Sequence, residues 1–272
     1  MRELGPLKWF LGIRVIRDRE SRRLWLCQDT YIKNVVHRYN LEGYKPTSIP
    51  LPPEKLEKYD KQAEKSQIHQ FQQKVGSIMY AAVMTRPDIA CATSKLCEHL
   101  QNPGPRHIDA VDHTIRFLAG TATSAIEYSR DYIREVELAV QDEGDVFVVA
   151  GDAAFADNSD RKSTQGYIMK LFGGAIDWKS GKQSTVTTST TEAELLALSR
   201  TAQETYWWRR LFDDAQFDPG HDIHILCDNR QTVDSMLKET IELKTKLRHI
   251  DIYNHWLRQE VQEGRITIKW VL

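Results

Sequence analysis

The sequence predicts an α/β fold for the carboxyl-terminal half of the chain, and two observations carry this prediction. Short apolar runs typical of buried strands, such as residues 146–150 and 223–227, alternate with longer segments whose apolar residues recur every three or four positions. The order expected across residues 146–272 is β-β-β-α-β-α-α-β. Strands and helices that alternate in this way pack as a sheet covered by helices, so we expect a layered α/β domain.

Each element of this half has its own local signal. The glycine pair 173–174 predicts a hairpin between the second and third strands. Leu195, Leu198 and Ala202 lie on one stripe of the longest helical segment, which indicates that one face of this helix is buried. We expect strands at residues 146–150, 167–172, 175–179, 223–227 and 266–272. We expect helices at residues 190–214 and 249–262, and a third helix that includes residues 233 and 237.

The amino-terminal half predicts a β-hairpin followed by helices. Apolar segments at residues 11–15 and 24–27 flank a charged stretch, which is the pattern of a hairpin. Asp29 or Thr30 can cap the helix that follows. Four prolines and a Lys/Glu-rich run make residues 45–66 a linker. Further helices are expected at residues 66–84, 89–100 and 107–118.

Composition limits the class of protein and its surroundings. The chain has 272 residues, 41% hydrophobic and 28% charged, with a net charge of −1, which is typical of a globular protein without a global basic field. The charged, irregular residues 129–145 place the expected boundary between domains at residues 1–130 and 145–272. None of the four cysteines forms a CxxC pair, so we expect buried free thiols in a reducing compartment. The sequence shows no membrane-length apolar run and no signal peptide, so we expect a cytoplasmic or nuclear protein that is not secreted and has no membrane partner.

Three acidic residues stand near the ends of expected strands and helices. Asp152 ends the first strand of the α/β domain, Glu194 lies in the first turns of the long helix, and Asp228 ends the fourth strand. Sites in open α/β sheets form at such chain ends. Converging carboxylates repel one another, and hard divalent cations such as Mg²⁺ relieve that repulsion. For any one of these acids, a helix cap or a turn residue is an equally good interpretation.

Ordered sequence words around these acids resemble the ribonuclease H domain of copia-type retrotransposons. In the second half the words are DAAFAD at 152–157, DRKSTQGY at 160–167, IDWKS at 176–180, KQ at 182–183, STTEAELLAL at 189–198, CDN at 227–229 and RHIDI at 248–252. Words in the first half resemble the thumb and connecting region of the adjoining reverse transcriptase: LKWFLGI at 7–13, VGSIMY at 75–80, TRPDIA at 85–90 and RFLAG at 116–120. The resemblance implies a ribonuclease H-like mixed five-stranded sheet with flanking helices, preceded by a small α+β reverse-transcriptase thumb/connection region.

The resemblance also implies roles for the acids. Asp152, Glu194 and Asp228 match the family's catalytic residues, which bind two Mg²⁺ or Mn²⁺ ions and cut the RNA strand of an RNA–DNA hybrid. In related domains the matching glutamate begins the apolar stripe of the helix, which is the position of Glu194. Glu192 is rejected as a ligand, because it lies two residues earlier and roughly 200° round the helix. The implied partners are the hybrid and the upstream reverse transcriptase domains of the parent polyprotein.

Polar residues near the expected site are candidates for contact with the hybrid, because backbone charge dominates nucleic-acid affinity. The candidates are Arg161, Lys162, Lys179, Lys182 and Gln183. Ordinary solvated side chains are an equal interpretation for the basic ones. The hydroxyl residues at 187–191 either contact phosphate or a ribose 2′-OH, or cap the long helix. For His249 and Asp251, a structural or substrate-side role is favoured over metal binding.

Departures from the family pattern lower the expected activity. Ala154 and Phe155 stand where the first family word usually continues with Asp and Trp, and the chain ends at Leu272, before the family's fourth carboxylate. The Tyr-x-Asp-Asp word of the polymerase is also absent. We therefore expect weak or no cleavage by this chain. The alternative is a domesticated or decaying retroelement fragment that at most binds nucleic acid, and an actin-like nucleotide binder is disfavoured because a Gly-rich phosphate loop is missing.

Overall fold

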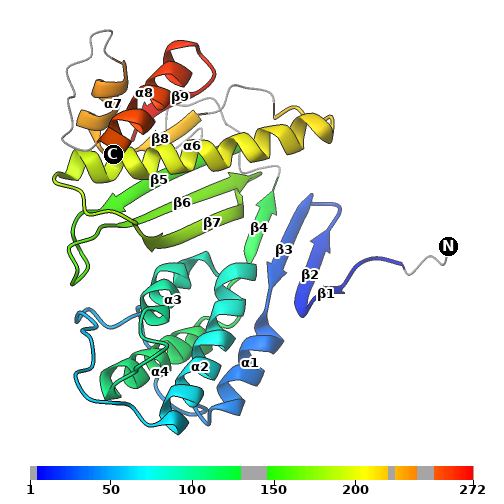
Figure 1. The fold of residues 1–272 in the computed structure, drawn as a ribbon. Coiled ribbons are helices and arrows are strands. Elements are labelled where there is room, and N and C mark those ends of the chain that lie inside the picture. Colours follow the sequence, from blue (N-terminus) through cyan, green and yellow to red (C-terminus); the bar gives the residue numbers. More distant parts are fainter. Residues whose placement is uncertain (1–4, 130–145, 220–223, 238–247, 272) are drawn as a thin grey trace. The chain divides into compact units, whose positions relative to one another are not determined.

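Hydrogen-bonded strands form two sheets, one in each half of the chain. A computed structural model describes residues 5–129, 146–219, 224–237 and 248–271. The chain divides into two units, Met1–Ser129 and Arg130–Leu272 (Figure 1). The first unit contains a four-stranded sheet and the second a five-stranded sheet.

The first unit combines an antiparallel sheet with a group of helices. Its strands, in sheet order, are β1 (Trp9–Phe10), β2 (Ile13–Asp18), β3 (Arg23–Cys27) and β4 (Ile126–Ser129). Its helices are α1 (Asp29–Arg38), α2 (Lys65–Met84), the 3₁₀ turn η1 (Pro87–Ile89), α3 (Ala90–Cys97) and α4 (Pro105–Gly120). Phe71, Val75, Ile78 and Ile115 are fully buried where these helices pack together. The expected hairpin and helices are therefore present.

Two local expectations for this unit are wrong. Gln28, rather than Asp29 or Thr30, is the N-cap residue of α1, and its side chain makes no capping hydrogen bond. Asp29 begins the helix and instead accepts a hydrogen bond from Arg14 at 3.0 Å. Cys91 is exposed, although the other cysteines are buried or half-buried and all four are free thiols. Its apolar neighbours in the sequence lie on the buried side of α3, whereas Cys91 does not.

The second unit is built on a mixed sheet in the order β7-β6-β5-β8-β9. The strands are β5 (Phe147–Ala154), β6 (Thr164–Leu171), β7 (Gly174–Lys182), β8 (His224–Cys227) and β9 (Thr267–Trp270). Strands β5, β6 and β7 pair antiparallel, whereas β8 pairs parallel with both β5 and β9. Phe147, Val149, Met169 and Ile225 form the buried side of this sheet. The predicted mixed five-stranded sheet with flanking helices is confirmed.

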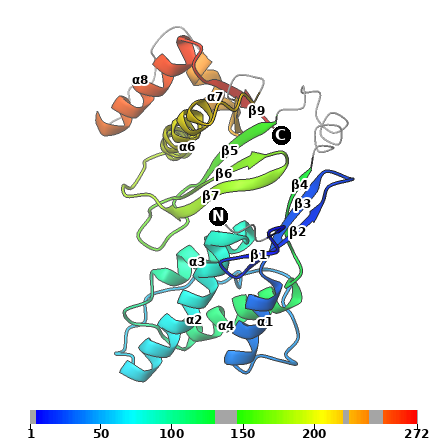
Figure 2. The same cartoon turned by 90° about the vertical axis from the view of Figure 1, so that its right-hand side faces the viewer.

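Helix α6 (Thr190–Asp214) lies along one face of this sheet, over β5 and β6 (Figure 2). Helix α8 (Arg248–Gln262) packs against α6. Helix α7 (Arg230–Leu237) contacts α8 and β9. The stripe Leu195, Leu198 and Ala202 is buried, as predicted. A Cβ atom at Gly151 of β5 would lie 2.4 Å from the Oγ1 atom of Thr201 on α6, so only glycine permits this close approach.

Among the helices of the described residues, none is both long enough and apolar enough to cross a membrane.

Candidate active site

The parallel pairing of β5 with β8 brings two of the predicted acids to the same edge of the sheet. Ala150 pairs with Leu226. Asp152 lies two residues further along β5, and Asp228 lies two residues further along the chain, just after β8. Both acids are exposed. Asp152 does not end its strand, as the sequence suggested, because antiparallel pairing with β6 continues as far as Ala154. Strand β8, in contrast, ends at Cys227, directly before Asp228.

Glu194 completes the cluster from the first turns of α6. Its side chain is buried, with 5% of the residue exposed. Ligand atoms of Glu194, Cys227 and Asp228 all lie within 4.8 Å of one another. Burial, together with the neighbouring carboxylates of Asp152 and Asp228, raises the pKa of Glu194 to about 7, although a backbone hydrogen bond from Ala153 acts in the opposite direction. The three carboxylates therefore form one electrostatically coupled group.

Glu192 lies outside this group and caps the helix. Its carboxylate accepts hydrogen bonds from the N–H and the hydroxyl of Thr188, at 2.6 and 2.7 Å. Its own N–H donates to the hydroxyl of Ser189, the N-cap residue of α6, at 3.1 Å. These bonds satisfy donors that a helix start otherwise leaves unpaired. Glu192 and the hydroxyl residues at 188–189 therefore act in the cap, and the choice of Glu194 as a metal ligand stays a prediction.

Short-range contacts hold the two aspartates in place. Asp152 accepts a hydrogen bond from the N–H of Ala153 at 2.7 Å. The indole of Trp270 on β9 donates to the main-chain oxygen of Asp228 at 3.0 Å. The guanidinium of Arg230 lies over the Trp270 ring, 5.3 Å from its centre, which adds a cation–π contact at the same edge. The last strand therefore supports the backbone beside the acid cluster.

Cys227 is a neighbour of the site that sequence reasoning missed. Its thiol is buried beside Glu194 and Asp228, and burial, together with the nearby carboxylates, raises its pKa to about 11. The only signal in the sequence is that Cys227 directly precedes Asp228. Side chains alternate along a strand, so Cys227 faces the same side of the sheet as Ile225, and both are buried in the core beneath α6.

The candidate nucleic-acid contacts occupy different surroundings. Arg161 is exposed in the β5–β6 turn, Lys179 is exposed on β7, and Lys162 is half-buried. The ammonium of Lys182 lies 3.4 Å from a carboxylate oxygen of Asp160, so this turn and the end of β7 are linked.

Gln183 differs from the basic candidates because it is buried, with 3% exposed. Its amide nitrogen donates to the main-chain oxygen of Ala193 at 2.8 Å. The side chain therefore joins the end of β7 to the start of α6, one residue before Glu194. The side chains of His249 and Asp251 lie outside the described part of the chain.

Comparison with curated proteins shows the family. The chain is 34% identical over 278 residues to the retrovirus-related Pol polyprotein from transposon TNT 1-94 of Nicotiana tabacum, an alignment that covers 98% of this chain and 20% of that protein. It is 31% identical over 264 residues to the retrovirus-related Pol polyprotein from transposon RE1 of Arabidopsis thaliana, covering 96% of this chain and 17% of that protein. The chain belongs to the copia-type retrotransposon Pol polyproteins. As a Pol segment, it spans no more than 20% of the length of these relatives.

No protein-family model matches this Pol segment. Among solved structures, it is similar to LC11-RNase H1 isolated from compost by a metagenomic approach, with a TM-score of 0.36 and 14% identity. That alignment covers 47% of the Pol segment and 84% of the other chain.

Proposed function

We propose that the second unit of this Pol segment is a ribonuclease H domain that cuts the RNA strand of an RNA–DNA hybrid with the help of Mg²⁺ or Mn²⁺. We assign residues 145–272 to this domain and residues 1–130 to the thumb and connection region of a reverse transcriptase. The observation that carries the proposal is the cluster of Glu194 and Asp228, whose ligand atoms lie within 4.8 Å of each other. The carboxylate of Asp152 on β5 is near enough to help raise the pKa of Glu194.

The donor set suits hard divalent cations. Carboxylate oxygens are the ligands that Mg²⁺ and Mn²⁺ prefer, and a cation removes the repulsion that raises the pKa of Glu194. The Cys227 thiol is a soft ligand, which these hard ions do not favour, so it does not compete with the carboxylates. When bound, such ions activate water and stabilise the leaving oxygen of a phosphodiester.

The chain's own residues supply binding and orientation. Asp152 and Asp228 are exposed at the sheet edge, where a nucleic-acid backbone has access to them. Glu194 lies deeper, fixed by the capped start of α6, so its carboxylate is held at a constant position relative to the aspartates. Arg161, Lys162, Lys179 and Lys182 are proposed to contact phosphates, which adds affinity without reading the base sequence.

The test is cleavage of an end-labelled RNA–DNA hybrid in millimolar Mg²⁺, with RNA–RNA and DNA–DNA duplexes as substrate controls. Any cleavage by this chain should be weak, should depend on Mg²⁺ and should fall in the RNA strand only. Asp152→Asn should abolish it, whereas Asp214→Asn, a matched change at an exposed position at the end of α6, should not. Melting curves of both variants report whether the fold is retained.

A second readout is independent of activity. Calorimetric titration of the chain with Mg²⁺ should show binding that Asp152→Asn weakens and Asp214→Asn leaves unchanged. Equal Mg²⁺ binding by both variants would contradict the assignment of the acids. Binding of the hybrid without any cleavage would replace the enzymatic role with a nucleic-acid-binding role.

A further inference from the structure

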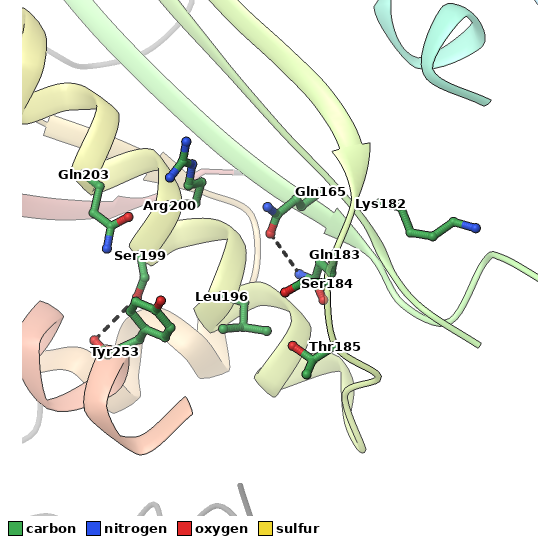
Figure 3. A pocket seen from close by; sticks show the side chains of 10 residues that line it. All are labelled: Gln165, Lys182, Gln183, Ser184, Thr185, Leu196, Ser199, Arg200, Gln203 and Tyr253. Carbon is green, nitrogen blue, oxygen red and sulfur yellow. Dashed lines mark hydrogen bonds between the residues drawn. The ribbon is translucent and has the colours of Figure 1, made fainter. Parts of the chain in front are cut away.

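A pocket with both polar and apolar walls lies beside α6 within the second unit. Its volume is about 450 Å³, and residues of β6, the end of β7, α6 and α8 line it (Figure 3). Leu196, Ser199 and Gln203 come from one face of α6, and Leu196 is two residues, roughly 200°, round the helix from Glu194. The pocket is therefore on the opposite side of the helix from the carboxylate cluster, and the proposed cleavage does not account for it.

An unsatisfied hydrogen-bond acceptor belongs to this pocket. Gln183 is 97% buried, with 3% exposed, and its amide nitrogen donates to the main-chain oxygen of Ala193 at 2.8 Å and to the side-chain oxygen of Gln165 at 3.2 Å. Both partners are acceptors, so the orientation of the amide is determined. Its Oε1 atom then has no hydrogen-bond partner among the described residues. A buried acceptor without a donor is costly, and a ligand carrying an N–H group would remove that cost.

The other walls favour a flat, polar ligand. Gln165 and Gln203 carry both donors and acceptors, the combination with which amide side chains read base edges. The residue Tyr253 is 40% exposed and its ring can stack on a base, and Leu196 offers an apolar surface. The volume is within the range of small-molecule sites. Figure 3 shows the amide of Gln183 between Gln165 and Leu196, with Tyr253 across from them.

A positively charged side chain, that of Arg200, lies at the rim of the pocket rather than inside it. Arg200 lines the pocket and forms an ion pair with Glu204 one helical turn away, with 45% of the arginine side chain exposed. Exposed pairs of this kind are weak and exchange partners readily. Lys182 points away from the pocket in Figure 3, towards Asp160. An isolated phosphate is a poor match for the interior, because the unsatisfied atom there needs a donor.

We propose that this pocket binds a single nucleotide, with the base inside against Gln183 and Tyr253 and the phosphate at the rim beside Arg200. The source is either a free nucleoside monophosphate or one nucleotide of a single strand, since both present the same base and phosphate. Binding requires neither the carboxylate cluster nor a metal ion.

The experiment is titration calorimetry of the purified chain in EDTA with the four nucleoside 5′-monophosphates and with ribose 5-phosphate. We expect at least one nucleotide to bind, and ribose 5-phosphate to bind about tenfold more weakly or not at all, because it lacks the base. Arg200→Glu should weaken nucleotide binding by about tenfold. Arg210→Glu, the same charge reversal at an exposed position of the same helix, should leave it unchanged.

Separate arms identify the source and exclude the catalytic site. A single-stranded oligonucleotide that binds more tightly than the monophosphate, with the same loss in Arg200→Glu, assigns the pocket to a strand. Tighter binding of the monophosphate assigns it to free nucleotide. Asp152→Asn should bind as well as wild type in EDTA, whatever its cleavage activity. No binding of any nucleotide, equal binding of ribose 5-phosphate, or equal loss in the two arginine variants overturns the proposal.

Discussion

The carboxylates of Glu194 and Asp228 have oxygen atoms within 4.8 Å of each other, although one belongs to helix α6 and the other follows strand β8. Burial of Glu194 and the charges of Asp152 and Asp228 together raise its pKa to about 7. The metal-free protein therefore keeps an acid cluster that weakens its own fold at neutral pH, and this strain is measurable.

Replacing Glu194 with glutamine should stabilise the metal-free protein. The substitution removes a buried charge and its repulsion, so the free energy of unfolding at pH 8 in EDTA should rise by roughly 1–3 kcal/mol. Urea denaturation followed by circular dichroism measures it. Glu204→Gln, at a less buried glutamate of the same helix that pairs with Arg200, should change stability by less than about 0.5 kcal/mol. A less stable Glu194→Gln protein would show that the carboxylate is satisfied without a cation.

The stability of the metal-free protein should fall between about pH 5 and pH 8. The pKa of Glu194 is about 7 in the folded chain and has an ordinary value of 4.5, so the folded state holds the proton over this interval while the unfolded state releases it. The stability that Glu194 contributes by holding this proton is complete below pH 4.5 and is lost as the pH rises through 7. Acids with lowered pKa values, such as Glu260, change the stability only at lower pH.

The measurement for this pH dependence is the difference between wild type and Glu194→Gln in urea denaturation at each pH, which cancels other titrating groups. The two proteins should converge in stability near pH 5, and millimolar Mg²⁺ at pH 8 should restore the wild type. A constant difference across the interval would mean that Glu194 titrates normally.

Substitutions at Glu192 and Glu194 should affect two different properties, the stability of the fold and the affinity for Mg²⁺. Glu192→Ala removes the two hydrogen bonds from Thr188 and should lower the free energy of unfolding by about 1 kcal/mol, the usual cost of losing a helix cap. Mg²⁺ affinity, measured by calorimetry, should stay close to that of wild type. Glu194→Ala should instead lose Mg²⁺ binding, without a loss of the stability that the cap provides. Loss of Mg²⁺ binding in Glu192→Ala would exchange the roles of the two residues.

Gly151→Ala should disturb the contact between β5 and α6. The added Cβ would lie 2.4 Å from the Thr201 Oγ1 atom, so the helix must shift, at a cost of roughly 1–3 kcal/mol. Hybrid cleavage should fall as well, because Glu194 is carried on that helix. Gly76→Ala in α2, where a Cβ meets no atom within 4 Å, serves as the control and should be neutral or stabilising.

A second substitution tests the cause of this loss. Combining Gly151→Ala with Thr201→Ala removes the colliding hydroxyl, so the double variant should lose less stability than the sum of the two single changes. Additive losses in thermal melting would show that the clash is relieved elsewhere.

Local sequence signals predicted the helices and the order of the elements in the second unit. Helix α6 begins and ends where the sequence predicted, at Thr190 and Asp214, because its cap residue and its apolar stripe are both local features of the sequence. The mixed character of the second sheet followed from the family resemblance. The roles of Asp152, Glu194 and Asp228 in metal binding, and of the basic residues in nucleic-acid binding, stay predictions.

Only the tertiary structure decided the features that depend on pairing between distant segments. Strand β5 continues to Ala154 because β6 pairs with it, and β4 joins β3 across about a hundred intervening residues. The burial of Gln183 and the place of Cys227 beside Glu194 also depend on how α6 lies on the sheet. Such contacts join residues far apart in the chain, whereas propensity and periodicity report only on neighbours. The sequence therefore identifies which acids are available, and the packing of α6 against β5 and β8 brings them together.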